Sequence, residues 1–245
     1  MTTEQPPAPL QRERAVAIVV AAGRGERFGL ADKVFLPLAG RPMIAYVLDA
    51  LEQSASVRDV VLVVGSHTRA SADDLVLNGP WTKVLAIVGG GERRQDSVIA
   101  GVSAAPADAQ IVVVHDGARP LVTVDLIERS IAHAAEVGAS IAAVPVTDTL
   151  KRVEDGRIVT TLPRHGLWAA QTPQTFRADL LRAALSDPRA SRESFTDEAA
   201  LFEMLGLPVA IVTGDVTNLK VTHRADLAIA EALFGARRMA VRIGQ

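Results

Sequence analysis

Short stretches of nearly continuous apolar residues, rich in valine and isoleucine, recur along the first part of the chain. They read AVAIVVAA from Ala15, DVVLVVG from Asp59, KVLAIVGG from Lys83, QIVVVHDGARP from Gln110 and ASIAAVPV from Ala139. A strand with one solvated face would alternate apolar and polar residues, whereas these runs are apolar throughout. The pattern therefore predicts strands that are buried on both faces, as in a parallel sheet covered by helices.

Stretches with helical periodicity separate several of these runs. RPMIAYVLDALEQS begins with Pro42 near its first turn, RRQDSVIAGVSAA follows the third run, and TVDLIERSIAHAAEVGA closes at Gly138, a predicted C-cap. Strand and helix alternate to about Val146. This alternation predicts an α/β protein with a doubly wound, mostly parallel but mixed sheet between helices.

The alternation breaks at TDTLKRVEDGRIVTTLPRHGLW, which starts at Thr147. Two short β-prone runs flank Asp155-Gly156, a dipeptide typical of a hairpin turn, so residues 147–164 are predicted to form a projecting β-arm. Helical patterns in RADLLRAALS and DEAALFEMLG and a strand-like VAIVTG follow. We expect a disordered leader at 1–14, a single domain at 15–236 and a C-terminal tail at 237–245.

Composition and charge exclude several classes of function. The 26 basic and 28 acidic side chains give a formal net charge of −2, which offers no basic field for nucleic acid. The absence of cysteine excludes disulfides, thiolate metal sites and a cysteine nucleophile. No run is long enough to predict a membrane span, and the polar, proline-rich N-terminus has no apolar signal core. The sequence thus predicts a cytoplasmic protein without nucleic-acid or membrane partners.

The bend after the first predicted strand is a candidate phosphate site. In VVAAGRGERFGLADK, Gly23 and Gly25 would let backbone N–H groups approach phosphate oxygens, while Arg27 and Lys33 add positive charge. The bend lacks the third glycine of a dinucleotide fingerprint, because Phe28 stands there, and it does not read as a Walker-type loop. The alternative is an ordinary tight turn between a strand and a helix.

Seven motifs occur in one order over nearly the whole chain: AAGRGERFG…K, GGGERRQDSV, VHDGARP, PVTDTLKR, LWAAQTPQ, TDEA and NLKVT. Together they resemble the 2-C-methyl-D-erythritol 4-phosphate cytidylyltransferases of the non-mevalonate isoprenoid pathway. The resemblance implies a nucleotide-diphospho-sugar transferase-like fold and an enzyme that joins CTP to a sugar-alcohol phosphate with release of pyrophosphate. It also implies a divalent cation, Mg²⁺, held mainly by CTP.

The resemblance assigns roles to matching positions. It implies Arg27 and Lys33 as transition-state stabilisers, and Arg164 and Lys220 as substrate-positioning residues. Nucleotide-binding positions would be Ala21, Ala22, Gly23, Gly25, Gly91, Glu92 and Ser97. Acceptor-binding positions would be Asp116, Arg119, Thr149, Thr172 and Thr196, with Asp116 also the candidate metal ligand. Simpler interpretations compete at some sites: Ser97 or Asp96 as a helix cap, Thr196 as a helix N-cap, and His115 as a packed side chain.

Family resemblance further implies a homodimer in which the arm carries Thr149 and Arg164 to the partner's acceptor phosphate; the alternative is a plain surface hairpin. Glu92 stands where other members often have aspartate. Two other functions share the fold: a ribitol-phosphate cytidylyltransferase and a non-catalytic nucleotide sensor. The motif HDGARP favours the isoprenoid enzyme over the ribitol-phosphate cytidylyltransferase. The cations expected at two phosphate sites (Arg27, Lys33, Arg164 and Lys220) disfavour the non-catalytic sensor. The broken glycine fingerprint disfavours an NAD-dependent oxidoreductase.

Overall fold

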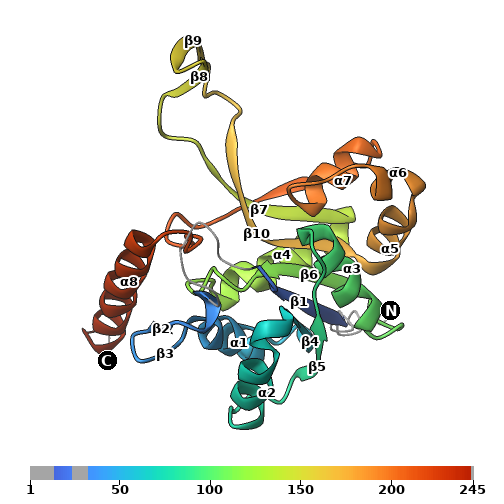
Figure 1. Ribbon diagram of the computed structural model, residues 1–245, viewed down its shortest axis with the longest axis vertical. Coiled ribbons are helices and arrows are strands. Elements are labelled where there is room, and N and C mark those ends of the chain that lie inside the picture. Colours follow the sequence, from blue (N-terminus) through green and yellow to red (C-terminus); the bar gives the residue numbers. More distant parts are fainter. Residues whose placement is uncertain (1–13, 24–32, 244–245) are drawn as a thin grey trace, which may run out of the picture.

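A mixed seven-stranded sheet forms the centre of the computed structural model, which describes residues 14–23 and 33–243 (Figure 1). The strand order is β11-β7-β10-β6-β1-β4-β5. All five apolar runs predicted from the sequence are confirmed as strands. The strands are β1 (Ala15–Ala21), β4 (Val57–Val64), β5 (Val84–Gly89), β6 (Ile111–Asp116), β7 (Ala139–Pro145), β10 (Trp168–Arg177) and β11 (Ala210–Thr213).

Burial on both faces is confirmed for β1, β4, β6 and most of β7, but it is wrong for β5, which forms an edge of the sheet and leaves Leu85 52% exposed. In β1, Ala17 and Val19 contact one apolar cluster with α1 and α4, whereas Val16 and Ile18 contact a second cluster with α3 and α7. All four side chains are fully buried. Because β1 pairs in parallel with both β4 and β6, their carboxyl ends meet at one edge of the sheet. The helices are α1 (Met43–Gln53), α2 (Arg69–Leu77), α3 (Arg94–Ala104), α4 (Val124–Val137), α5 (Ala178–Ser186), α6 (Pro188–Arg192), α7 (Glu198–Met204) and α8 (Arg224–Ile243).

Strand β10 was not predicted. It runs antiparallel between β6 and β7, so it is an interior strand of the sheet. Its sequence, WAAQTPQTFR, buries four polar side chains and contains a proline, so neither apolar continuity nor alternation marks it. The buried side chains are hydrogen-bonded instead, as with Thr175, whose Oγ1 lies 2.6 Å from the Ser130 hydroxyl. Helix α2 was also not predicted from the sequence.

The predicted β-arm is confirmed as a two-stranded antiparallel ribbon of β8 (Leu150–Glu154) and β9 (Arg157–Leu162). Asp155 (φ 48°) and Gly156 (φ 75°) both occupy the left-handed region, as a tight hairpin turn requires. Figure 1 shows the arm standing away from the rest of the chain. Its apolar side chains are solvent-exposed, with Val153, Ile158 and Val159 each more than half exposed.

The ends of several helices follow from local sequence. Pro42 is the N-cap residue of α1, and Gly138 (φ 98°) is the C-cap of α4, as predicted. Helix α8 continues past residue 236 to Ile243, so residues 237–243 of the segment that we expected as a separate tail extend the last helix. This helix packs beside the short strands β2 (Pro37–Leu38) and β3 (Arg41–Pro42). It also contacts α1, where the centroids of the Phe234 and Tyr46 rings lie 4.3 Å apart. Within the described ranges, no helix has the length and apolar character to cross a membrane.

Candidate active site

A cavity of about 760 Å³ opens at the edge where the carboxyl ends of β1, β4, β5 and β6 meet. Nine of the residues predicted for the site line it, and they come from strand ends, loops and helix starts that are far apart in the sequence. They are Ala21, Ala22, Gly23, Lys33, Gly91, Glu92, Ser97, Asp116 and Lys220. The motifs are therefore brought together at the edge where open α/β sheets bind ligands.

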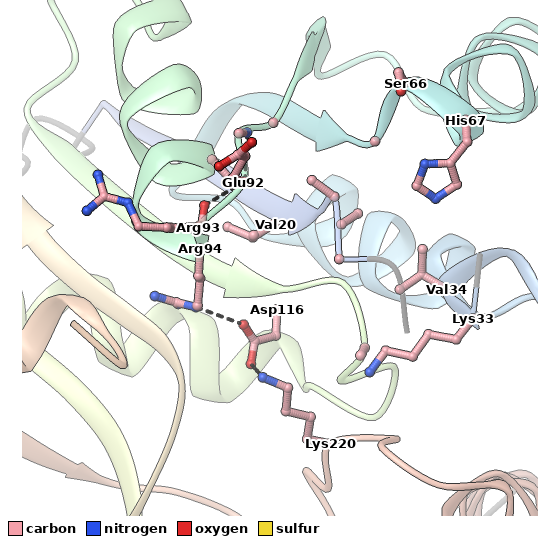
Figure 2. A pocket seen from close by; sticks show the side chains of 18 of the residues that line it. Val20, Lys33, Val34, Ser66, His67, Glu92, Arg93, Arg94, Asp116 and Lys220 are labelled. Atoms are coloured by element: carbon pink, nitrogen blue, oxygen red, sulfur yellow. Dashed lines mark hydrogen bonds and ion pairs between the residues drawn. The ribbon is translucent and has the colours of Figure 1, made fainter. Parts of the chain in front are cut away.

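Lys33 begins the short 3₁₀ helix η2 (Lys33–Phe35), on the far side of the bend after β1. Its Nζ donates a hydrogen bond to the Val221 carbonyl at 3.1 Å, so it lies beside the segment that carries Lys220. Gly25 and Arg27, the other residues predicted in this bend, lie outside the described residues. The two lysines approach the cavity from opposite ends of the sequence (Figure 2).

The loop between β5 and α3 is packed tightly against β1. A Cβ atom on Gly90 would lie 2.3 Å from the Ala22 Cβ and 2.6 Å from the Ser97 Oγ, so only glycine fits there. The Ser97 hydroxyl accepts a hydrogen bond from the Gly91 N–H at 3.2 Å. The N-cap of α3 is Arg93, and Asp96 accepts from its backbone N–H in a capping box. Ser97 thus closes the loop, whereas Asp96 takes part in the cap.

Asp116, the last residue of β6, is the carboxylate at the centre of the cavity (Figure 2). Its Oδ2 lies 2.8 Å from the Lys220 Nζ and 3.6 Å from the Arg119 Nε, and its Oδ1 lies 3.7 Å from the Arg94 Nε. Burial alone would raise the pKa of Asp116, but these three positive charges outweigh it and lower the pKa to about 2. The carboxyl is consequently ionised at neutral pH.

His115, beside Asp116, is a packed side chain, as the simpler interpretation predicted. Its ring is buried, and burial lowers its pKa to about 4, so the ring is neutral. The Thr172 hydroxyl accepts a hydrogen bond from the Asp116 N–H at 3.0 Å. It also lies 3.0 Å from the His115 Nδ1, and we assign the hydroxyl as the donor and Nδ1 as the acceptor of this second hydrogen bond. Thr172 was predicted to face the acceptor, but its hydroxyl is engaged here with the backbone that carries Asp116.

Four other predicted residues do not line the cavity. Arg119 is buried behind it, where its guanidinium donates to the Asn218 carbonyl at 2.7 Å and so fixes the segment before Lys220. Thr149 and Arg164 lie at the base of the arm, and Arg164 donates to the Thr147 carbonyl. Thr196 is exposed, and the N-cap of α7 is not Thr196 but Asp197, which accepts from the Ala200 N–H.

Sequence reasoning missed Arg94 and Glu198. Arg94 lines the cavity, and its Nη1 donates to the Glu198 Oε1 at 2.6 Å. Both residues lie inside quoted motifs, GGGERRQDSV and TDEA. The sequence signal was weak because two consecutive arginines at a helix start usually indicate a solvated surface. Ser66 and His67, after β4, also line the cavity and were not predicted.

A family model described as 2-C-methyl-D-erythritol 4-phosphate cytidylyltransferase matches residues 15–236. The chain belongs to this family. Two bacterial relatives carry the same description. The one from Pelotomaculum thermopropionicum is 44% identical over 232 residues, covering 92% of this chain and 96% of the relative. The one from Desulforamulus reducens is 43% identical over 225 residues, covering 91% and 96%.

Solved structures of cytidylyltransferases from this family share the fold. The 2-C-methyl-D-erythritol 4-phosphate cytidylyltransferase of Thermus thermophilus is 34% identical, with a TM-score of 0.73, over 90% of this chain and 98% of that chain. The 4-diphosphocytidyl-2C-methyl-D-erythritol synthase of Anaerococcus prevotii is 26% identical, with a TM-score of 0.79, over 92% and 100%. The predicted fold class, a helix-flanked mixed sheet of the nucleotide-diphospho-sugar transferase type, is therefore confirmed.

The cavity of this cytidylyltransferase carries an excess of positive charge. Four cations line it (Lys33, Arg93, Arg94 and Lys220) against two carboxylates (Glu92 and Asp116), and Arg119 lies behind Asp116. Such a site binds phosphates and stabilises the charge that develops when one phosphoryl oxygen displaces another. A phosphate monoester is already ionised near neutral pH, so an attack by its oxygen needs no strong general base.

Proposed function

We propose that the chain transfers a cytidylyl group from CTP to 2-C-methyl-D-erythritol 4-phosphate in isoprenoid precursor synthesis. An oxygen of the acceptor phosphate attacks the α-phosphorus of CTP. A new P–O–P bridge forms, the bond from the α-phosphorus to pyrophosphate breaks, and 4-diphosphocytidyl-2-C-methyl-D-erythritol results. Family membership supports this reaction, and the observation that carries it here is the convergence of Lys33, Lys220 and Asp116 on the cavity that the two glycine-rich loops line.

The nucleotide would lie along the edge formed by the loops after β1 and β5. Ala21, Ala22 and Gly23 would face its phosphates, together with Gly25 and Arg27. Gly91, Glu92 and Ser97 would recognise cytosine, since a pyrimidine fits a loop whose closest contacts are backbone groups and a hydroxyl. Lys33 and Arg27 would stabilise the charge that builds up on the α-phosphoryl oxygens.

The acceptor would lie on the Asp116 side of the cavity, held by Lys220 and supported by Arg119, Thr172 and Thr196. We propose that Thr149 and Arg164 reach the acceptor phosphate of a partner subunit in a homodimer. Two observations support this: neither residue lines the cavity of its own chain, and the arm exposes three apolar side chains that a second copy would cover.

We propose that Mg²⁺ accompanies CTP. Among the described residues there is no cluster of three or more histidine, aspartate or glutamate side chains that would hold a metal on its own. Asp116 fits the role of a single carboxylate ligand, because Mg²⁺ is commonly held by one or two carboxylates and substrate phosphates. Bound Mg²⁺ would neutralise phosphate charge. The cytoplasmic location stays a prediction from the sequence.

Pyrophosphate release tests the proposal. The protein is incubated with Mg²⁺, one nucleotide (CTP, UTP, ATP or GTP) and one acceptor (2-C-methyl-D-erythritol 4-phosphate or ribitol 5-phosphate). We expect rapid release with CTP and the erythritol phosphate, UTP as the nearest competitor, and little release with purines. Preference for ribitol 5-phosphate would replace the acceptor assignment, and equal turnover of ATP would overturn the cytidylyl assignment.

A further inference from the structure

A buried carboxylate lies behind the cavity wall, outside the set of residues discussed for the reaction. Glu198 is the first residue of α7, and its side chain is 4% exposed. Its Oε1 accepts from the Arg94 Nη1 at 2.6 Å, while its Oε2 is buried without a hydrogen-bond partner in the described part of the chain. Burial raises the pKa of Glu198, which the adjacent guanidinium opposes. A carboxylate in this position is costly unless its partner stays in place.

The backbone of Glu198 is fixed from the sheet. The Gln174 side chain on β10 accepts from the Glu198 N–H at 3.2 Å and from the Ala199 N–H at 3.3 Å, and it donates to the Asp197 Oδ2 at 2.8 Å. Gln174 is itself fully buried. The carboxylate is therefore held by three elements, α7, β10 and, through Arg94, α3. A side chain anchored in this way is suited to orient its partner.

Arg94 links this buried carboxylate to the cavity. Its side chain is 23% exposed and lines the cavity, and its Nε lies 3.7 Å from the Asp116 Oδ1 (Figure 2). The guanidinium thus spans from Glu198 to Asp116, and its partly exposed side chain borders the space where the substrates would bind. Asp197 also interacts electrostatically with Arg94 and Glu198, so the cations and carboxylates of this cluster balance, and the cavity-lining Arg94 is the group that an anion would meet.

We propose that Glu198 is a positioning residue that holds the Arg94 guanidinium toward the cavity, where Arg94 binds a phosphate group of the substrates. This inference rests on the proposed function. Glu198 belongs to the TDEA motif, and its carboxylate would act on the site through Arg94. This role is separate from the one expected for the exposed Thr196 of the same motif. A planar guanidinium that is fixed by one carboxylate presents its remaining N–H groups in a defined direction, which suits bidentate binding of phosphate.

Steady-state kinetics of Glu198→Gln, Arg94→Ala and the double variant test the proposal, with Glu203→Gln, an exposed glutamate of the same helix, as the matched control. We expect Glu198→Gln to lower kcat/KM by roughly 10- to 100-fold through misplacement of Arg94. The same substitution should have little further effect in the Arg94→Ala background. The KM that rises identifies the phosphate: that of CTP or that of the acceptor.

Glu198→Asp, which keeps the charge with a shorter side chain, should recover part of the loss, and Arg94→Lys should not match the wild type because it lacks the fork. The proposal is overturned if Glu198→Gln lowers the melting temperature with unchanged kcat/KM, or if its effect is fully additive with that of Arg94→Ala. Failure of the wild type to release pyrophosphate from CTP and the acceptor would instead contradict the proposed function, so the two failures are distinguishable.

Discussion

Asp116 is ionised because its charged neighbours outweigh its burial. Desolvation of a carboxylate that is 7% exposed would favour the protonated form, yet Lys220, Arg94 and Arg119 together lower its pKa to about 2. Such a group is a poor proton donor or acceptor at neutral pH. The role of Asp116 is instead to fix the positions of the cations around it, such as Lys220. Lys33 differs from Lys220 because its Nζ donates to the Val221 backbone carbonyl.

Lys33→Ala should therefore lower kcat by roughly 10²-fold, the scale for losing one donor to a developing oxyanion. The KM for CTP should change much less, because other groups still bind the ground-state triphosphate. Steady-state rates with both substrates varied separate the two quantities. A variant that keeps kcat and binds CTP more weakly would show that Lys33 only anchors the ground state.

The lowered pKa of His115 should make the stability of the protein depend on pH. Its folded pKa of about 4 lies below the ordinary value of about 6.5, so between these values the unfolded chain binds more protons. The free energy of unfolding should then fall as the pH falls, by about 2 kcal/mol from this group between pH 7 and 5. Urea unfolding of His115→Gln should show a smaller decrease over this range than the wild type. Equal decreases in the two proteins would refute this origin.

The family resemblance predicted residues that line the cavity themselves, and it was weaker on residues that act through others. Asp116 and Lys220 were singled out because their motifs, VHDGARP and NLKVT, match those of the family, and both line the cavity. Arg94 was missed because its function depends on Glu198, which is 104 positions away in the sequence. Thr172 was singled out, but no pattern indicated that its hydroxyl would be engaged by Asp116 and His115.

At the scale of elements, the hydrophobic pattern predicted those strands that are stabilised by the burial of apolar side chains. The five apolar strands and the hairpin turn were found because valine-rich runs and Asp155-Gly156 carry local signals. Strand β10 was not found because hydrogen bonds, and not apolar contacts, compensate the burial of Gln171, Thr172, Gln174 and Thr175. Pairing partners of this kind are distant in sequence, so a single strand does not reveal them.

The loop between β5 and α3 gives a prediction at the same scale. Gly90→Ala would place a Cβ within 2.6 Å of both Ala22 and Ser97, so the loop must shift away from β1. We expect the KM for CTP to rise by roughly tenfold or more, because displaced binding groups lose their alignment. Gly89→Ala is the matched control, since nothing lies within 4 Å of its added Cβ. Equal kinetics for the two variants would exclude this loop from nucleotide binding.

The whole molecule is incomplete as a single chain if the arm serves a partner. Arg164→Ala and Lys33→Ala should each be nearly inactive as homodimers. In a mixed dimer, a shared-site arrangement places both lesions in one site and leaves the other site intact. Co-refolding equal amounts should restore up to about a quarter of wild-type activity, because half of the dimers are mixed and each has one intact site of two.

The control for this experiment is mass spectrometry of the intact assemblies, which establishes that mixed dimers have formed. Co-refolding two samples of the same variant should restore nothing. If mixed dimers are present without recovered activity, Arg164 acts within its own chain. In that case the exposed apolar side chains of the arm need another explanation.

The reaction itself is tested most directly by following the phosphorus atoms. ³¹P NMR of the wild-type protein with Mg²⁺, CTP and 2-C-methyl-D-erythritol 4-phosphate should show loss of the acceptor monoester signal. A pair of mutually coupled diphosphate signals and an equal amount of pyrophosphate should appear in its place. An unchanged monoester signal, or CMP and pyrophosphate formed by hydrolysis without a new diphosphate, would contradict cytidylyl transfer by this chain.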